Sequence, residues 1–198
     1  MKNIIFDIGN VLLSFQPDEF LRKYYNDQEI GDLMTIIFSS EEWDQLDLGT
    51  ITIQETIDSL TLKHPHYHDE ITFILKHWTN MMSPIEKNVK IAYQLKEMGY
   101  PLYLLSNFHN EAIQEMFDKY DFFNIFDGHV ISAHVHTMKP CEGIYHILMD
   151  KYQLKSEECV FIDDSLANIN TANTLGMTGV YLPYLKSLDD ELKAIHVL

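Results

Sequence analysis

Four polar clusters stand behind short apolar runs, and their side chains have the chemistry needed to transfer a phosphoryl group. The clusters are Asp7 after NIIF, Ser106-Asn107 after PLYLL, Lys139-Pro140, and Asp163-Asp164 after CVFI. In a sheet of parallel strands the carboxyl ends meet at one crevice, so we expect these groups to converge. One such cluster is ordinary turn or helix-cap chemistry. Four in this order predict an active site.

The set fits phosphoryl transfer to a carboxylate. Asp7 would attack phosphorus and form an aspartyl-phosphate, which divides hydrolysis into two easier steps. Ser106 and Asn107 would donate hydrogen bonds to the phosphoryl oxygens, and Lys139 would offset negative charge.

The three aspartates predict a metal site. Asp163 and Asp164, together with Asp7, form an oxygen-rich cluster whose members would repel one another strongly without a cation. Mg²⁺ is a hard cation that suits a few carboxylates with water and phosphate oxygens. We therefore expect Mg²⁺ as the cofactor.

Strand-like and helical segments alternate, which predicts an α/β, Rossmann-like, doubly wound parallel sheet of about five strands. The strand-like runs cover residues 3–6, 101–105, 129–132, 159–162 and 179–182. Ser83-Pro84-Ile85-Glu86 is a capping-box pattern and predicts a helix start, with the helix ending near Gly99. The pattern of residues 165–175 predicts another helix, ended by Gly176.

Residues 16–82 differ from the rest, because they contain several short helical patterns and no convincing strand. Thr52 and Glu55 form a capping-box pattern, and residues 67–78 are amphipathic. About 65 residues is far more than one crossover helix needs. We expect a core domain of residues 1–15 and 83–198, and a helical cap domain of residues 16–82 that covers the active end of the sheet.

The composition limits the partners. The chain is 46% hydrophobic with a formal net charge of -16, which argues against nucleic acid and anionic membranes. Cys141 and Cys159 lack CxxC spacing, so we expect both thiols to be reduced. The first residues lack the pattern of a signal peptide. No apolar stretch approaches the roughly 18 residues that a membrane-spanning helix needs. We expect a cytoplasmic monomer or homodimer with reduced cysteines, acting on a small phosphorylated molecule.

The same residues resemble the four motifs of the haloacid dehalogenase superfamily. FDIGNV is similar to its first motif, LLSN to its second, MKP to its third and FIDDSLANI to its fourth, and the resemblance spans essentially the whole chain. Within the superfamily, FD-x-G-N-V, WDQLDLGTIT and KPCEGIY resemble sugar-phosphate phosphatases of the α-D-glucose-1-phosphate phosphatase type.

The resemblance implies a role for each site residue. It makes Asp7 the nucleophile and a metal ligand, with the backbone carbonyl of Gly9 also on Mg²⁺. It implies that Asp164 is a direct ligand and that Asp163 acts through water. The residues implied to hold the phosphoryl group are Ser106, Asn107 and Lys139.

Gly9 departs from the superfamily pattern. Most relatives carry an aspartate there, which protonates the leaving oxygen and then activates water, and glycine can do neither. Loss of a positioned acid/base costs about 10²–10⁴-fold in rate. The replacement could be a cap residue such as Asp44, one of the ten histidines, or water.

Three other functions fit the motifs less well than a phosphatase does. A 2-haloacid dehalogenase needs no metal and lacks adjacent aspartates in its fourth motif, so the pair Asp163-Asp164 argues against it. A phosphomutase needs the aspartate that Gly9 replaces. A non-catalytic binding or regulatory protein is supported by Gly9, but the joint presence of Asp7, Lys139, Asn107 and Asp164 argues against it.

The cap indicates the substrate. A few short helices would roof a small pocket and exclude large leaving groups. Trp43 and Asp44, within residues 43–47, are expected to offer an aromatic face and carboxylates to sugar hydroxyls. We therefore expect a sugar phosphate such as glucose 1-phosphate, whose hemiacetal leaving oxygen also needs less protonation.

Overall fold

The core of the protein is a parallel five-stranded sheet. The structure is a computed structural model, and it describes residues 2–198. The strand order is β5-β4-β1-β6-β7. The strands are β1 (Asn3–Phe6), β4 (Leu102–Ser106), β5 (Gly128–Ile131), β6 (Cys159–Asp163) and β7 (Thr178–Tyr181). All four neighbouring pairs are parallel. The predicted fold class is confirmed, and each strand lies within one residue of its predicted bounds.

Helices cover both faces of the sheet, which explains why its strands are apolar on both sides. One face packs against α6 (Glu86–Glu97), α7 (Asn110–Lys119) and α11 (Leu188–Ala194). The other face packs against α9 (Glu142–Tyr152) and α10 (Leu166–Thr174). Phe6 of β1 shows the result: it is fully buried, and it pairs with Leu104 on one side and Ile162 on the other.

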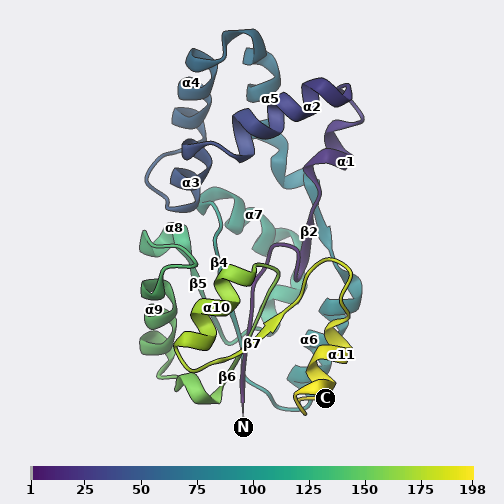
Figure 1. Cartoon of the computed structure of the whole chain (residues 1–198), viewed down its shortest axis with the longest axis vertical. Helices are drawn as coiled ribbons and strands as arrows, with labels where there is room; N and C mark the ends of the chain where they lie inside the picture. The colour runs from purple at the N-terminus through teal and green to yellow at the C-terminus, as the bar shows by residue number, and fades with distance from the viewer. Residues whose placement is uncertain (1) are drawn as a thin grey trace.

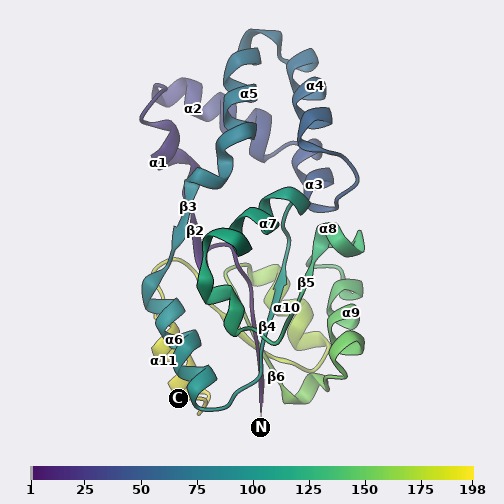
Figure 2. The same cartoon turned by 180° about the vertical axis from the view of Figure 1, so that it is seen from behind.

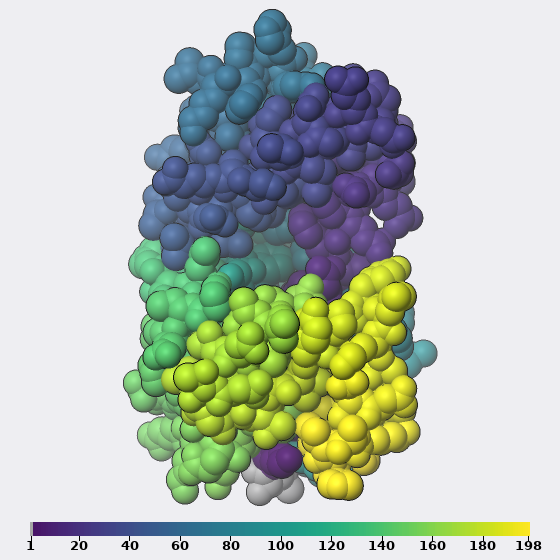
Figure 3. All heavy atoms as spheres, in the orientation of Figure 1, coloured from purple at the N-terminus to yellow at the C-terminus, as the bar shows by residue number. Residues whose placement is uncertain are grey.

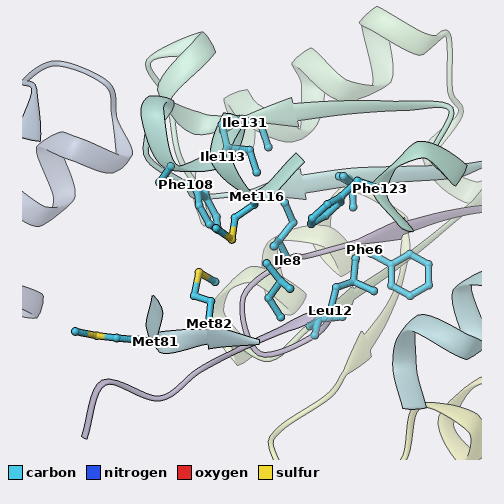
Figure 4. Packing of buried hydrophobic residues seen from close by; sticks show 14 of the residues in the cluster. Phe6, Ile8, Leu12, Met81, Met82, Phe108, Ile113, Met116, Phe123 and Ile131 are labelled. Carbon is cyan, nitrogen blue, oxygen red and sulfur yellow. The ribbon is translucent and has the colours of Figure 1, made fainter. Parts of the chain in front are cut away.

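Hydrophobic packing continues from the sheet into the loops at its carboxyl end (Figure 4). Ile8 and Leu12, in the loop after β1, are fully buried in this cluster. Met116 of α7 lies in the same cluster as Phe108, which follows β4. The loops that carry polar site residues are therefore anchored by apolar neighbours.

A helical insert follows the first strand and stands at the opposite end of the molecule from both termini (Figures 1 and 2). It is flanked by β2 (Leu13–Phe15) and β3 (Met82–Pro84), which pair antiparallel. Its helices are α1 (Pro17–Leu21), α2 (Asp27–Leu33), α3 (Glu41–Asp47), α4 (Ile53–Lys63) and α5 (His68–His77).

Shorter helical segments complete the chain. They are the π-helical turn Met34–Phe38, the helix α8 (Ser132–Val135), and the 3₁₀ turns Pro65–Tyr67, Trp78–Met81, Asp121–Ile125 and Ser156–Glu158. None of the described helices is both long enough and apolar enough to cross a membrane.

The two predicted capping boxes have different outcomes. Thr52 caps α4 as predicted: its amide donates to Glu55 Oε2 at 2.8 Å, and its hydroxyl accepts from the Glu55 amide. The prediction at Ser83 is wrong, because the chain there is strand β3 and α6 begins only at Glu86. Ser83 Oγ instead contacts Ser14 Oγ of β2 at 2.9 Å. Because Ser83 pairs with β2, its side chain is not available to cap α6.

Candidate active site

The polar clusters meet at the carboxyl end of the sheet, beneath the insert (Figure 1). Asp7 directly follows β1, Ser106 ends β4, and Asp163 ends β6. Lys139 lies in the loop between α8 and α9. Because β4, β1 and β6 are neighbours in the sheet, their ends bring these side chains into one region.

The Lys139 ammonium group is the centre of the cluster. Its Nζ lies 2.9 Å from Asp7 Oδ1 and 2.7 Å from Asp163 Oδ2, and its side chain is 1% exposed. Burial alone would lower the pKa of Lys139, but the carboxylates of Asp7 and Asp163 outweigh it and hold the pKa above its ordinary value. Lys139 therefore stays charged and offsets negative charge in the site.

The adjacent aspartates have different surroundings. Both oxygens of Asp163 accept from Asn168 Nδ2 at 3.0 Å, and Oδ1 also accepts from the Ser165 amide at 2.7 Å. Asp164 accepts from Asn10 Nδ2 at 3.0 Å and faces the pocket described below. The oxygens of Asp163 are thus engaged in hydrogen bonds within the protein, whereas Asp164 lies where it could bind a ligand in the pocket.

The aspartates form a donor set that fits a hard cation. Asp7, Asp163 and Asp164 each offer an oxygen, and these atoms lie within 4.8 Å of one another. Burial raises the pKa of Asp7 to about 7 against the opposing effect of Lys139, and burial also raises the pKa of Asp164. One ammonium group leaves three carboxylates under-compensated, so a divalent cation with oxygen preference suits the site.

Two asparagines hold the site together. Asn107 Nδ2 donates to the Lys139 carbonyl at 2.9 Å, and the Lys139 amide donates to Asn107 Oδ1 at 2.8 Å. Asn10 has a φ of 53° and accepts from the Phe15 amide at 3.0 Å while donating to Asp164. Both side chains fix loop backbone as well as facing the pocket.

A pocket of about 170 Å³ joins this cluster to the insert. Figure 3 shows a hollow on one face of the molecule, between the blue insert and the green and yellow core. The lining residues at the polar end are Asp7, Gly9, Asn10, Asn107 and Asp164; those on the remaining wall are Phe15, Trp43, Asp47, Trp78, Met82 and Phe108. The pocket therefore combines a charged floor with a largely aromatic wall.

Some predicted residues lie in this pocket and others do not. Trp43 lines it, whereas Asp44 is exposed and is outside the lining set. Ser106 is 1% exposed and is also outside that set. The contacts predicted for Asp44 and Ser106 with substrate stay predictions.

Sequence reasoning missed most of the wall. It included Asp47 only as part of residues 43–47, which were expected to offer carboxylates, and singled out Asp44 instead. One signal could have singled out Asp47: it stands four residues after Trp43 on α3, and this spacing puts two side chains on one helix face. Phe15 and Met82 had no comparable signal, because they reach the pocket through the pairing of β2 with β3.

The chain belongs to the haloacid dehalogenase-like hydrolase family, whose model matches residues 1–176. The resemblance to this superfamily is thereby confirmed. The narrower resemblance to glucose-1-phosphate phosphatases stays a prediction.

Relatives and solved structures agree with this membership. A sesquiterpene phosphatase from Aspergillus oryzae is 27% identical over 183 residues, which cover 91% of this chain and 89% of that protein. A family enzyme from Bacteroides thetaiotaomicron, solved with magnesium and inorganic phosphate, has a TM-score of 0.76 and 21% identity, covering 96% of this chain and 98% of that one. L-2-haloacid dehalogenase from Xanthobacter autotrophicus has a TM-score of 0.70 and 15% identity, covering 100% and 84%. These structures share the fold, and the aspartate cluster is present in this chain.

The different surroundings of the paired aspartates generate a prediction. Asp164→Ala should weaken Mg²⁺ binding more than Asp163→Ala, because only Asp164 faces the pocket. Asp163→Ala should instead lower the free energy of unfolding by roughly 3–5 kcal/mol, because it breaks a buried ion pair. Calorimetric titration with MgCl₂ and urea unfolding in chelator measure the two effects. Equal losses of affinity, or unchanged stability of Asp163→Ala, would contradict this division of roles.

Proposed function

We propose that this protein is a Mg²⁺-dependent phosphatase that hydrolyses small phosphate monoesters through an aspartyl-phosphate on Asp7. The observation that carries the proposal is the buried Lys139 ammonium group, which contacts both Asp7 and Asp163. Asp7 itself lines the pocket, together with Asp164. A carboxylate nucleophile with a fixed cation beside it is what phosphoryl transfer to a carboxylate needs.

Four residues of the polar clusters have parts in the proposed reaction. An Asp7 oxygen attacks phosphorus while the bond from phosphorus to the leaving oxygen breaks. Lys139 offsets negative charge on the transferred group. The side chain of Asn107 orients Lys139 by holding the Lys139 backbone. Ser106 and Asn107 donate hydrogen bonds to the phosphoryl oxygens. Water then attacks the phosphorus of the aspartyl-phosphate and releases inorganic phosphate.

The same floor would hold the cation. Asp7, Asp164 and the Gly9 carbonyl are the proposed ligands of Mg²⁺, and Asp163 is proposed to act through water. When bound, the ion supplies positive charge that helps an anionic substrate to bind a chain of net charge -16.

A dehalogenase and a non-catalytic protein fit the site less well than a phosphatase does. A dehalogenase reaction needs no metal, yet three carboxylates share this site with one ammonium group. A non-catalytic role leaves the buried charges without a purpose, although such charges are costly to keep.

Two classes of leaving group suit the pocket, and both are small. Its volume of about 170 Å³ is below the roughly 300–1,000 Å³ of sites for drug-sized ligands. The class expected from the sequence is a sugar phosphate such as glucose 1-phosphate. It is supported by the aromatic face of Trp43 and the carboxyl group of Asp47, which both line the pocket.

The second class is the phosphate of an apolar alcohol, and the pocket wall favours it. Asp47 is the only ionisable side chain that the described residues contribute to that wall. The remaining wall residues are Phe15, Trp43, Trp78, Met82 and Phe108. Several hydroxyls of a hexose would lack partners there, at about 1–3 kcal/mol for each buried group. The similarity to a sesquiterpene phosphatase supports the same ranking.

The proposed nucleophile gives a direct prediction. Asp7→Asn keeps the volume of the side chain but removes its negative charge, so phosphatase activity should fall to background. The measurement is the release of inorganic phosphate with Mg²⁺ present, and chelation of the wild-type protein should have the same effect until Mg²⁺ is restored. Substantial activity of Asp7→Asn, or full wild-type activity in excess chelator, would refute the mechanism.

The pocket wall gives a second prediction, on substrate choice. In a panel of phosphorylated metabolites, short apolar alcohol phosphates should have the highest kcat/KM, followed by sugar phosphates. Trp78→Ala should lower kcat/KM for apolar substrates more than for glucose 1-phosphate, because it removes apolar wall. A ranking led by sugar phosphates would reverse the order of the two classes. A ranking led by nucleotides or phosphopeptides would exclude both.

A further inference from the structure

Gly9 leaves the pocket without a side chain at the position where most family members carry an acid/base aspartate. Gly9 lines the pocket, and among the described residues no atom beyond its chain neighbours lies within 4 Å of a Cβ built there. The space is open, so a proton donor on the opposite wall can approach the same leaving oxygen.

Asp47 is the carboxyl group on that opposite wall. It is the last residue of α3 in the insert, and it lines the same pocket as the nucleophile Asp7. Its side chain is 19% exposed. A carboxyl group in this position can reach the oxygen that bonds the leaving group to phosphorus, because that oxygen must lie between the charged floor and the wall.

The backbone around Asp47 is held firmly on the core. Ser132 Oγ donates to the Asp47 carbonyl, and His136 Nδ1 lies 2.9 Å from the Leu48 carbonyl oxygen. Gly49 has a φ of 67°, and a Cβ at this position would lie 2.4 Å from the carbonyl oxygen of Ala133. This close approach requires glycine and fixes the end of α3 against α8.

The charges around Asp47 leave it able to exchange a proton near neutral pH. Burial raises the pKa of Asp47 to about 7, the negative charges of Asp44 and Asp7 act in the same direction, and Lys139 opposes them. His109 Nε2 lies 3.3 Å from Asp47 Oδ1. Burial lowers the pKa of His109 to about 3, so the ring is neutral and adds no positive charge to favour ionised Asp47.

His109 itself is a poor candidate for the missing acid. A group whose pKa is about 3 carries almost no proton to donate at neutral pH. The ring is packed between Trp43 and Trp78, with centroids 4.4 and 4.6 Å away. Neither ring nitrogen has a hydrogen-bond partner among residues 2–198. His109 therefore packs against wall residues Trp43, Trp78 and Asp47 without lining the pocket itself.

We propose that Asp47 is the general acid and general base of this enzyme, replacing the group that Gly9 lacks; the inference rests on the proposed phosphatase function. In the first step Asp7 bonds to phosphorus, the bond to the leaving oxygen breaks, and the Asp47 carboxyl proton passes to that oxygen, giving the free alcohol. In the second step the Asp47 carboxylate takes a proton from water as the water oxygen bonds to phosphorus. The bond to Asp7 breaks, inorganic phosphate leaves, and Asp47 is protonated again.

The test compares Asp47→Asn with the wild type on an alkyl phosphate and on 4-nitrophenyl phosphate, both with Mg²⁺. For the alkyl phosphate, kcat/KM should fall by about 10²–10⁴-fold, because its leaving oxygen needs the proton. For 4-nitrophenyl phosphate, kcat/KM should be nearly unchanged because its leaving group departs as a stable anion. Its kcat should fall, together with KM, because the second step still needs the base.

The pH dependence gives a second readout. The ratio of wild-type kcat/KM for the alkyl phosphate to that for 4-nitrophenyl phosphate should fall as pH rises through about 7, where Asp47 loses its proton. Ionisation of the nucleophile Asp7 affects both substrates alike and cancels in this ratio. In chelator, the Tm of Asp47→Asn relative to wild type should rise as pH increases from about 4 to about 7 and then level off. Over this range the carboxyl group is ionised in the unfolded chain but still protonated in the folded wild type, so only the wild type loses stability.

Controls separate this inference from the proposed function. Glu41→Gln removes an exposed carboxylate from the same helix and should change neither substrate's kinetics. An equal loss of kcat/KM for both substrates in Asp47→Asn would overturn the role of Asp47 while leaving the phosphatase intact. The same conclusion would follow if Asp44→Asn, and not Asp47→Asn, caused the loss of kcat/KM. No wild-type hydrolysis of either substrate would refute the phosphatase itself.

Discussion

Compensation of negative charge is the constraint on which the rest of this structure depends. Three carboxylates lie within 4.8 Å of one another at the end of a buried sheet, and Lys139 contacts two of them at 2.9 and 2.7 Å. Without that ammonium group the cluster would be uncompensated and strongly destabilising. Other polar side chains therefore position Lys139. Asn107 holds the backbone of Lys139, and Asn168 holds Asp163, which in turn contacts the ammonium group.

The insert and the core enclose a pocket beside this charged cluster. The insert's helices contribute aromatic side chains that pack on one another, such as Trp43 against Trp78 with ring centroids 5.2 Å apart. The contact between Gly49 and Ala133 holds the end of α3 on the core. The wall thus brings apolar surface and one carboxyl group, Asp47, to a floor that can bind phosphate. In the proposed mechanism the insert handles the leaving group, and the core handles the phosphoryl group.

Features set by local sequence were predictable, and features set by tertiary contact were not. The five strands and their terminal polar residues followed from apolar runs that end abruptly, and the Thr52 cap of α4 depends only on neighbours. The Ser83 cap was predicted wrongly because its partner Ser14 is 69 residues away. Asp47 was expected only as part of residues 43–47, and His109 was not singled out, because docking of the insert brings these two residues together. A residue's type and spacing show that it can do chemistry, and the insert decides whether it faces the pocket.

The central claim is that a phosphoryl group passes through Asp7. Mixing the enzyme with Mg²⁺ and 4-nitrophenyl phosphate, followed by rapid acid quench and peptide mass analysis, tests it most directly. We predict one added phosphoryl group on the peptide that contains Asp7, formed in a burst with the release of 4-nitrophenol and more abundant in Asp47→Asn. Phosphate release without a phosphorylated peptide, or with the phosphoryl group on a different residue, would contradict the mechanism.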